Sequence, residues 1–472
     1  MPECSKFDAS DEADSRQQRK KGGHPRMKVA QGKSDRNGTL AFAVALLLAV
    51  TLALAGCGKG AGTSDAPSQQ GGETPKTATE PVTLTAAIDA VIIDPALEKL
   101  IQEELKASRP NITLNIIQPT KGNTLNELIA AGTVPDLIFT YNGRLSTYAD
   151  RELLRDMTEL AKTHQIDLSR FDPQMIDDVR KFSDKGELYG IPYGTNFHAL
   201  YYNKDIFDKF GVAYPQDGMT WDQVVDLAKK VTRKDGNTQY RGFDPGAGIS
   251  WIYQPLGIQA DDYKTGKSSI NNEQWRKVFE LVHSFYSIPG NEPGTVTAAD
   301  QFLKDKTLAM IGYTNLFSQL ESAGQNGLNW DVVQYPSYPE RPNIYGNASV
   351  NVIMVTKTSK HTDEAMQVIR AATSDRVQLE SSKQGKVSPL KSETVRAAFG
   401  TGLPFLQGKQ LQSIFKSKPV PYPLSSPYRS KSESIASKYF KEYDSGSMDV
   451  NSALSKAEEE INKMLLEEKA KK

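Results

Sequence analysis

Five histidines and two cysteines are the residues of this 472-residue chain that most directly suggest metal or nucleophilic chemistry. No His-Glu-x-x-His or Cys-x-x-Cys spacing joins any of them into a zinc site. Gly266-Lys267-Ser268 ends like a phosphate-binding loop, but Asp261 stands where the first glycine of that loop belongs. No Gly-x-Ser-x-Gly elbow offers a serine nucleophile. The sequence therefore predicts no metal, no cofactor and no catalytic residue, although paired carboxylates for glycoside hydrolysis stay open.

One cysteine follows a segment that is typical of export. Basic residues from Arg19 to Arg36 precede an apolar run over 40–55, which leads into Gly56 and Cys57. This run is short for a transmembrane helix, which needs roughly 20 residues, and small residues precede the cysteine as at a cleavage site. The segment resembles a lipoprotein signal peptide, which implies that Cys57 becomes the first mature residue and carries a lipid. An uncleaved anchor helix is the alternative.

The N-terminal organisation follows from this resemblance. Residues 1–56 form the signal region, and Met27 opens a more usual signal peptide than Met1 does. Residues 57–81, rich in Gly, Ser, Thr, Gln and Pro, read as a flexible linker that tethers the folded part. Cys57 is left alone in the mature chain, so no intramolecular disulfide is expected. We expect the protein on the extracytoplasmic face of the cell membrane, held there by its lipid.

Length and charge limit the classes of protein to which the chain can belong. A chain of 472 residues exceeds what one hydrophobic core usually serves, so two lobes with a cleft between them are expected. Lys plus Arg and Asp plus Glu are 57 each, without a basic block in the second half, so nothing indicates nucleic acid as a partner. A hydrophobic content of 38% is too low for a polytopic membrane protein. We expect a monomer.

The elements that must position any site read as alternating strands and helices. Residues 82–85 and 112–116 alternate as strands do, and between them Asp94-Pro95 can cap a helix. Strand, helix and strand in this order indicate a parallel α/β sheet. Thr220 and Gln223 form a capping box for a further helix. Other expected elements are strands at 136–140, 308–311 and 350–355 and a last helix over 454–465.

Several segments in fixed order carry a resemblance to a known family. They are Gly132–Phe139, Leu153–Thr158, Tyr189–Tyr193, Ala199–Asp205, Pro215–Trp221, Phe302 with Ala309–Gly312, and Ser359–Ala365. From about residue 83 to 470 the chain resembles the family 1 extracellular solute-binding proteins, the maltose-binding-protein-like components of ABC importers. The resemblance implies two α/β lobes joined by chain crossings, which close on a ligand like a hinged trap. It places one lobe at 83–195 plus 340–375 and the other at 196–339 plus 376–472.

Candidate ligand contacts follow the predicted strands, where open α/β sheets meet their ligands. Asn196 stands where a sugar-binding member of the family has an acid, and Trp251 matches a sugar-stacking aromatic of that member. Tyr313 departs from the Gly-Pro-Trp pattern that the family often has after its third block. The full candidate set is Tyr141, Asn142, Tyr193, Asn196, Trp251, Tyr313, Asn315, Phe317, Tyr345 and Tyr422, with Asn347 and Tyr428 nearby.

These residue types suit a neutral, polyhydroxylated ligand. Aromatic faces cover the C–H faces of a sugar ring, and amides both donate to and accept from hydroxyls. The alternative for each aromatic is core packing, which we expect for Trp221 and Trp275. His198 reads as a structural histidine.

We therefore expect the substrate-binding component of an ABC importer, which captures a small solute, most simply a carbohydrate, and delivers it to permease subunits. One alternative is a receptor for another solute such as a peptide. Alternatives of other classes are a secreted lipoprotein glycoside hydrolase and a cell-wall interaction module.

Overall fold

The chain divides into two units, Met1–Pro75 and Lys76–Lys472. The computed structural model describes residues 80–347, 349–424 and 426–471, all within the second unit. The expected signal region, Cys57 and nearly all of the expected linker lie outside the described residues, so these assignments stay predictions. In the part of the chain that is described, no helix is both long enough and apolar enough to cross a membrane.

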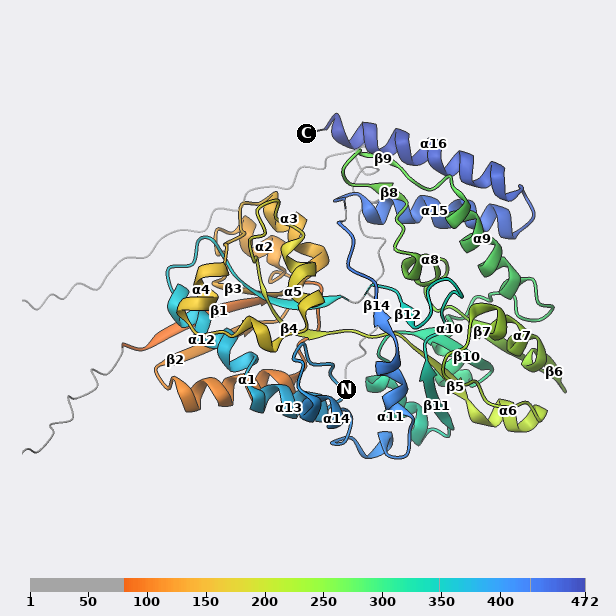
Figure 1. Cartoon of the computed structure of the whole chain (residues 1–472), viewed down its shortest axis with the longest axis horizontal. Coiled ribbons are helices and arrows are strands. Elements are labelled where there is room, and N and C mark those ends of the chain that lie inside the picture. The colour runs from red at the N-terminus through yellow and green to blue at the C-terminus, as the bar shows by residue number, and fades with distance from the viewer. Residues whose placement is uncertain (1–79, 348, 425, 472) are drawn as a thin grey trace, which may run out of the picture. The chain divides into compact units, whose positions relative to one another are not determined.

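A five-stranded sheet forms the centre of the first lobe, with the strand order β2-β1-β3-β13-β4 (Figure 1). β1 pairs in parallel with β2 and β3, whereas β13 runs antiparallel to both β3 and β4. The predicted strands of this lobe are confirmed, and the expected parallel arrangement holds for β1 and β2. The strands are β1 Val82–Ile88, β2 Ile112–Ile117, β3 Leu137–Tyr141, β4 Ile191–Thr195 and β13 Val350–Val355.

Helix α1 (Pro95–Ser108) begins where its sequence predicts. The Asp94 carboxylate accepts a hydrogen bond of 2.9 Å from the backbone N–H of Leu97, and Pro95 occupies the first turn. Proline fits there because the first helical amides have no partner within the helix. Leu97 and other apolar residues on the same side of α1 are buried against the sheet.

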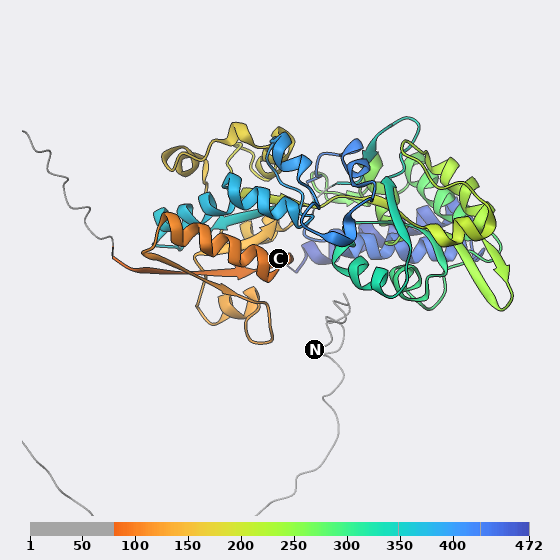
Figure 2. The same ribbon diagram turned by 90° about the horizontal axis from the view of Figure 1, so that it is seen from below.

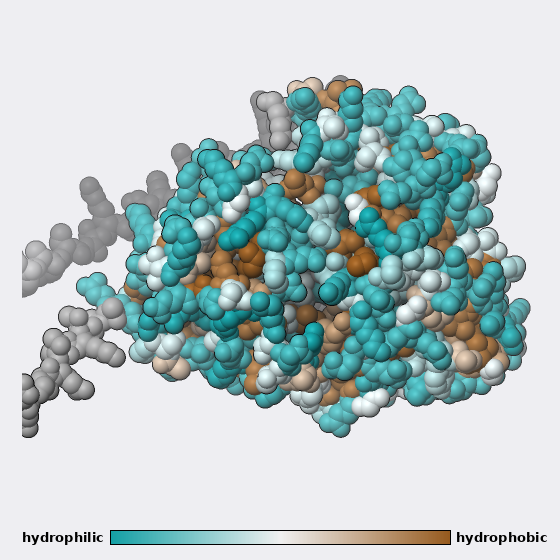
Figure 3. All heavy atoms as spheres, viewed as in Figure 1, coloured by the Kyte–Doolittle hydropathy of each residue, from teal (hydrophilic) through white to brown (hydrophobic). Residues whose placement is uncertain are grey.

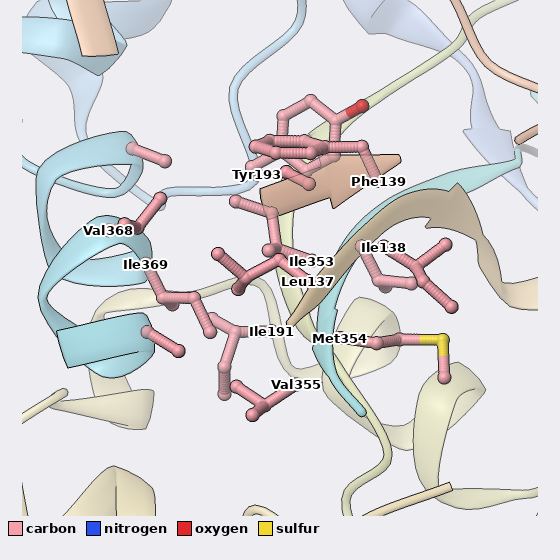
Figure 4. Packing of buried hydrophobic residues seen from close by; sticks show 14 of the residues in the cluster. Leu137, Ile138, Phe139, Ile191, Tyr193, Ile353, Met354, Val355, Val368 and Ile369 are labelled. Atoms are coloured by element: carbon pink, nitrogen blue, oxygen red, sulfur yellow. The ribbon is translucent and has the colours of Figure 1, made fainter. Parts of the chain in front are cut away.

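Helix α12 (Thr362–Ala372) lies beside α1 on the same face of the first sheet (Figure 2). Figure 4 shows Val368 and Ile369 pointing from α12 toward the buried side chains of β3, β4 and β13. Both side chains are fully buried, as are the strand residues that they face. Helix α5 (Pro173–Arg180) packs against β4 and β13 as well. The sheet is thus held by apolar contacts that the alternation in its strands predicts.

A second five-stranded sheet forms the centre of the second lobe, with the order β11-β5-β10-β7-β6. β5 runs antiparallel to β10 and β11, β10 runs parallel to β7, and β6 forms a hairpin with β7. The strand predicted at 308–311 is confirmed within β10. The strands are β5 Ala199–Asn203, β6 Arg233–Asp235, β7 Thr238–Asp244, β10 Leu308–Tyr313 and β11 Trp330–Gln334.

The second lobe buries its two predicted core tryptophans. Helix α7 starts with the predicted capping box, in which Thr220 and Gln223 each bond the backbone N–H of the other. Trp221 is 1% exposed and Trp275 is 0% exposed, which confirms the interpretation of both as core residues. The main helices of this lobe are α6 Lys204–Phe210, α7 Trp221–Val231, α9 Glu273–Tyr286, α11 Phe317–Gln325, α15 Arg429–Asp444 and α16 Val450–Lys469.

The chain passes between the lobes from β4 to β5, from β11 to β13, and again after α13 (Asp375–Lys383). We expected the last passage at residue 375, which is too early. Helix α13 packs on α1, and Val377 and Leu390 belong to the first hydrophobic core because their side chains face it. The short strands β12 (Ile344–Tyr345) and β14 (Lys418–Pro419) pair in parallel within two of these passages.

Short elements complete the described fold. They are α2 Leu125–Ala130, η1 Asn142–Arg144, α3 Leu145–Ala149, α4 Thr158–Thr163, η2 Leu168–Arg170, α8 Ser250–Tyr253, η3 Gln254–Leu256, β8 Asp261–Asp262, β9 Lys267–Ser268, α10 Ala298–Asp300, η4 Gln301–Asp305, α14 Glu393–Ala397, η5 Pro404–Leu406 and η6 Leu411–Lys416. The face seen in Figure 3 is mostly hydrophilic, with apolar side chains in smaller patches.

Candidate functional site

In each sheet, the strand register places the end of one strand beside the start of its antiparallel neighbour, at one edge of the sheet. In the first lobe the end of β3 lies beside the start of β13, because Tyr141 pairs with Asn351. In the second lobe the end of β10 lies beside the start of β5, because Tyr313 pairs with Ala199. Ligands of open α/β sheets bind outside the carboxyl ends of the strands, so these two edges are where a site is expected.

A cavity of about 300 Å³ lies at these edges and takes its walls from both lobes. This volume is at the lower end of the roughly 300–1,000 Å³ that small-molecule sites occupy. The lining residues are Tyr141, Gly143, Arg144, Ser146, Thr147, Asn196, His198, Trp251, Gln254, Thr314, Asn347, Ser349, Tyr422, Ser426, Pro427, Arg429, Ser430 and Glu433.

Three aromatic side chains give the cavity its apolar surface. Tyr141 ends β3, Trp251 lies in α8, and Tyr422 comes from the third passage between the lobes. The Trp251 ring is held edge-on by Tyr313, with ring centroids 4.8 Å apart. Burial raises the pKa of Tyr422 to about 12, so its hydroxyl stays protonated. These faces can cover the apolar side of a sugar ring.

A glycine lets two of these rings come together. A Cβ atom at Gly143 would lie 2.3 Å from the hydroxyl oxygen of Tyr422 and 2.4 Å from a ring carbon of Tyr141. No side chain fits at these distances, so the close approach of the two tyrosines requires glycine. The cavity wall therefore depends on Gly143 as much as on the aromatic residues.

The arginine on the first-lobe side is paired within the protein. Arg144 donates from Nε to Asp89 at 3.3 Å, and its Nη2 lies 3.2 Å from the same carboxylate oxygen. Tyr148 donates its hydroxyl to that oxygen too, and Thr140 contacts the Tyr148 hydroxyl at 2.8 Å. The Asp89 carboxylate thus balances the charge of Arg144 and fixes its direction.

The arginine on the second-lobe side is paired in the same way. Arg429 donates to Glu433 at 2.6 Å, one helical turn along α15, and to the Tyr422 hydroxyl at 3.2 Å. The Tyr253 hydroxyl also donates to Glu433. Each arginine that lines the cavity therefore has a carboxylate partner, and the two pairs together carry no net charge.

Uncharged polar side chains fill much of the remaining wall. Asn196 follows β4, and its Oδ1 accepts a 3.0 Å hydrogen bond from the backbone N–H of Phe197. Asn347 precedes β13 and is 8% exposed. His198 is 4% exposed, and burial lowers its pKa to about 3, so the imidazole is neutral at physiological pH.

Four of the ten predicted contacts line this cavity, namely Tyr141, Asn196, Trp251 and Tyr422. Tyr313 supports Trp251 from behind, and Tyr345 is 5% exposed and packs on His198.

The other four predicted contacts do not line the cavity, and their side chains pack or hydrogen-bond within the fold. Asn142 is fully buried, and its Oδ1 accepts from the backbone N–H of Val350. Tyr193 packs edge-on against Phe139 with ring centroids 5.5 Å apart (Figure 4). Asn315 accepts from the N–H of Phe317 at 2.9 Å, and Phe317 is 4% exposed within an apolar cluster.

Sequence reasoning missed the charged members of the site and assigned His198 only a structural role. Arg144 lies three residues after Tyr141, so the rule that ligands meet the ends of strands could have included it. Nothing local marks Arg429 and Glu433, because their i, i+4 spacing is that of an ordinary helix-surface ion pair.

A second cavity of about 620 Å³ lies on the other side of the same chain crossing. Successive residues between β4 and β5 alternate between the two cavities: Asn196 and His198 line the first, whereas Thr195 and Phe197 line the second. Extended backbone produces this alternation because neighbouring side chains point in opposite directions. Tyr345 also borders the second cavity. We take the smaller cavity as the candidate site because it reaches the carboxyl ends of β3 and β10, at Tyr141 and Thr314, which do not line the larger one.

Residues 101–399 match the family described as bacterial extracellular solute-binding protein. This span is more than half of the chain, and the chain belongs to that family. The resemblance seen in the sequence is thereby confirmed. In the described part of the chain, no three His, Cys, Asp or Glu side chains are grouped so that they could hold a metal ion.

Known relatives have different ligands in their names. The chain is 28% identical over 152 residues to the lactose-binding protein of Rhizobium radiobacter, which covers 30% of this chain and 34% of that protein. It is 26% identical over 167 residues to an sn-glycerol-3-phosphate-binding periplasmic protein of Agrobacterium fabrum, covering 32% and 37%. Each of these two alignments thus spans about a third of the relative.

Solved structures share the fold. An ABC substrate-binding protein of Listeria monocytogenes in complex with cycloalternan matches with a TM-score of 0.66 and 19% identity, covering 82% of this chain and 99% of that one. The expected two-lobed α/β fold is confirmed.

Proposed function

We propose that this protein captures a neutral carbohydrate by closing its two lobes over the cavity at the strand ends, and passes it to the permease of an ABC importer. The observation that carries the proposal is the composition of the cavity wall, where three aromatic side chains occur together with uncharged hydrogen-bonding groups and with arginines that are paired to carboxylates. Rings such as that of Trp251 can stack on a sugar, while the amide of Asn196 can both donate and accept. Hinge closure follows if the ligand binds the closed state more tightly than the open one.

The charge balance of the cavity favours a neutral sugar over a phosphate ester. A bound phosphate needs cations that are available to it, commonly in bidentate contacts. Arg144 and Arg429 already have Asp89 and Glu433 as partners, so an incoming anion would compete with a fixed carboxylate in each lobe. The names of the relatives include neutral ligands, lactose and cycloalternan, and an anionic one, sn-glycerol 3-phosphate, so the preference rests on the charge balance of the cavity.

Binding without chemistry is the better proposal for the same cavity. Hydrolysis of a glycosidic bond needs two carboxyl groups, roughly 5–9.5 Å apart, on either side of the bond. Among the described lining residues the one carboxylate is Glu433, and its Oε1 accepts hydrogen bonds from both Arg429 and Tyr253. We therefore propose a binding protein that is not an enzyme.

The cellular location of the protein is proposed from its N-terminal sequence. We propose that the signal region is cleaved before Cys57, that Cys57 carries the lipid, and that residues 58–81 tether a monomeric two-lobed receptor to the outer face of the cell membrane. Cys57→Ala should release the protein from membranes or leave it unprocessed. Unchanged membrane association, mobility and lipid labelling of this variant would contradict the anchor.

The ligand class can be tested by thermal shift and calorimetry on the purified mature chain. The panel contains glucose, lactose, maltose, maltotriose, mannotriose, glycerol 3-phosphate and a tripeptide. A ligand at a hundred times its dissociation constant adds about 2.7 kcal/mol of stability, so a binder raises the melting temperature clearly. We expect a neutral sugar to do so and to be recovered uncleaved. Binding of the phosphate or the peptide alone, or release of sugar products, would contradict the proposal.

A further inference from the structure

Two side chains in the wall of the cavity each have one buried polar atom without a hydrogen-bonding partner among the described residues. His198 and Asn347 are 4% and 8% exposed, and both line the cavity. Within the described residues, His198 Nδ1 and Asn347 Oδ1 have no hydrogen-bonding partner. Asn196 in the same wall differs, because its Oδ1 accepts from the backbone N–H of Phe197.

The surroundings of His198 explain why the protein gives it no partner. Its ring lies among three aromatic rings, with centroid distances of 5.2 Å to Trp251, 5.3 Å to Tyr335 and 5.4 Å to Tyr345. The hydroxyl of Tyr335 is directed to the backbone oxygen of Trp251 instead. Aromatic packing holds the imidazole in place, while its Nδ1 is left without a hydrogen-bonding partner among the described residues.

The two side chains come from neighbouring parts of the fold. His198 lies in the first passage between the lobes, and Asn347 lies two residues after Tyr345 in the second passage. The backbone between them is close to the histidine, since a Cβ atom at Gly346 would lie 3.3 Å from His198 Cε1. His198 and Asn347 thus belong to one wall, formed where two passages run side by side.

Buried polar groups without partners are rare in folded proteins, where roughly 90% or more are hydrogen-bonded. Leaving such a group unpaired is unfavourable, because its hydration is lost and nothing replaces it. Ten such atoms occur among the described residues, and the two that belong to the wall of this cavity, in His198 and Asn347, are the ones to which a bound ligand can supply partners. A neutral imidazole and a carboxamide each contain donors and acceptors, which is also true of a hydroxyl group.

We propose that His198 and Asn347 form an uncharged recognition pair that hydrogen-bonds the hydroxyl groups along one edge of the bound carbohydrate and so rejects analogues that lack them. The inference rests on the proposed function and adds the residues that would set its specificity. A site built to pair a hydroxyl discriminates strongly against the deoxy analogue, because the buried groups are then left unpaired.

The first variant is His198→Phe, because phenylalanine keeps the aromatic packing with Trp251, Tyr335 and Tyr345 and removes both nitrogens. The probe is the neutral sugar among glucose, lactose, maltose, maltotriose and mannotriose that gives the largest thermal shift with the unaltered chain. We expect calorimetry to show affinity about 5- to 150-fold weaker, the effect of leaving a buried hydroxyl unpaired. The melting temperature should hold or rise, because an unpaired polar group leaves the interior.

A second variant and a matched control separate recognition from folding. Asn347→Leu removes the amide at similar side-chain volume. It should lower the affinity for the same sugar and keep the fold. His283→Phe is the control, because His283 on α9 pairs with Asp444 at the end of α15 and does not line the cavity. It should leave sugar affinity within about twofold, the usual effect of a change without ligand contact.

Monodeoxy forms of the same sugar complete the test. At least one deoxy form should bind the unaltered chain more weakly than the parent sugar does. In His198→Phe or Asn347→Leu, the difference in affinity between the parent sugar and that deoxy form should largely disappear. Equal affinity of both variants and the unaltered chain for the parent sugar would overturn the recognition pair and leave the proposed function intact. If no neutral sugar in the panel shifts the melting temperature of the unaltered chain, the proposed function fails and the pair fails with it.

Discussion

The two cavities on either side of the first chain crossing differ in size and chemistry, although they share one short segment of backbone. The first is about 300 Å³ and combines aromatic faces with uncharged polar groups and internally paired charges. The second is about 620 Å³, with buried apolar residues such as Phe399 and exposed charges such as Lys418 at its rim. The larger cavity would be the default choice by volume. The smaller cavity reaches the ends of β3 and β10 in the two lobes and has the lining that suits a sugar, so it is the candidate site despite its lower volume.

Removing an aromatic ring from the second cavity should affect stability most. Phe399 is 2% exposed and packs against Phe197, Phe317 and Phe415 with centroid distances of 6.0, 5.9 and 5.0 Å. Phe399→Ala should lower the free energy of unfolding by about 3–5 kcal/mol, the usual effect of truncating a buried phenylalanine. Denaturant unfolding measures this change.

The same variant tests whether the two cavities are independent. In the folded protein, sugar affinity of Phe399→Ala should stay within about twofold, because Phe399 does not line the first cavity. Lys418→Ala, an exposed change in the same lining, should alter neither quantity. A large change in affinity for Phe399→Ala would show that the crossing couples the cavities, and the contrast between them would then be wrong.

A methyl group at Gly143 should disturb the first cavity alone. Gly143→Ala places its Cβ within 2.3 Å of the Tyr422 hydroxyl, so the Tyr141 and Tyr422 rings must separate. Overpacking of this kind typically costs about 1–3 kcal/mol, which here should appear largely as weaker sugar binding. Calorimetry measures the part of this energy that is lost from sugar binding, and the melting temperature measures the part that is lost from folding. Unchanged affinity would mean that the two tyrosines do not contact the ligand.

Trp251→Ala should give a comparable or smaller loss of affinity. The Trp251 ring is part-exposed in the cavity and is held by Tyr313 and His198. Losing a stacking aromatic should weaken sugar binding by about 1–3 kcal/mol, with a smaller effect on folding. Measuring both affinity and melting temperature distinguishes the outcomes. Outright unfolding would show that Trp251 is a core residue first, and unchanged values for both would show that it is peripheral.

The fold was largely predictable from the sequence because its signals are local. The Asp94 cap, the Thr220 and Gln223 capping box and the alternation in the strands each depend on neighbouring residues. The passage after α13 was placed too early, because whether Val377 faces the first or the second core depends on contacts with α1 far away in the chain.

The site was only partly predictable, and the reason is geometric. Tyr141, Asn196 and Trp251 follow strands or match family positions, so their place in the cavity could be expected. Phe317 also follows a strand, but the first turn of α11 directs it into an apolar cluster. Glu433 could not have been expected, because a long passage from the first lobe precedes α15 and sets where it meets the cavity.

The smallest expected effect concerns the pH dependence of folding, and it tests the neutral state of His198. Burial lowers its pKa from 6.5 to about 3 in the folded protein, whereas the unfolded chain keeps the ordinary value. At pH 8 and above both states are neutral, and the group contributes almost no pH dependence. Below pH 6.5 the unfolded chain takes up a proton that the folded protein does not, so stability falls with pH until about pH 3. Between pH 6.5 and 5.5 the loss is about 1 kcal/mol.

Comparing the unaltered chain with His198→Phe isolates this contribution from every other titrating group. The rings packed on His198 are those of Trp251, Tyr335 and Tyr345, and burial raises the pKa of both tyrosines, so they stay neutral over this range. Denaturant unfolding at several pH values should therefore show that the variant gains about 1 kcal/mol on the unaltered chain between pH 6.5 and 5.5. Parallel pH profiles for the two proteins would mean that His198 takes up its proton as readily in the folded state as in the unfolded chain, and so is protonated at pH 5.5. The wall of the first cavity would then carry a positive charge, and its contrast with the charged rim of the second cavity would be lost.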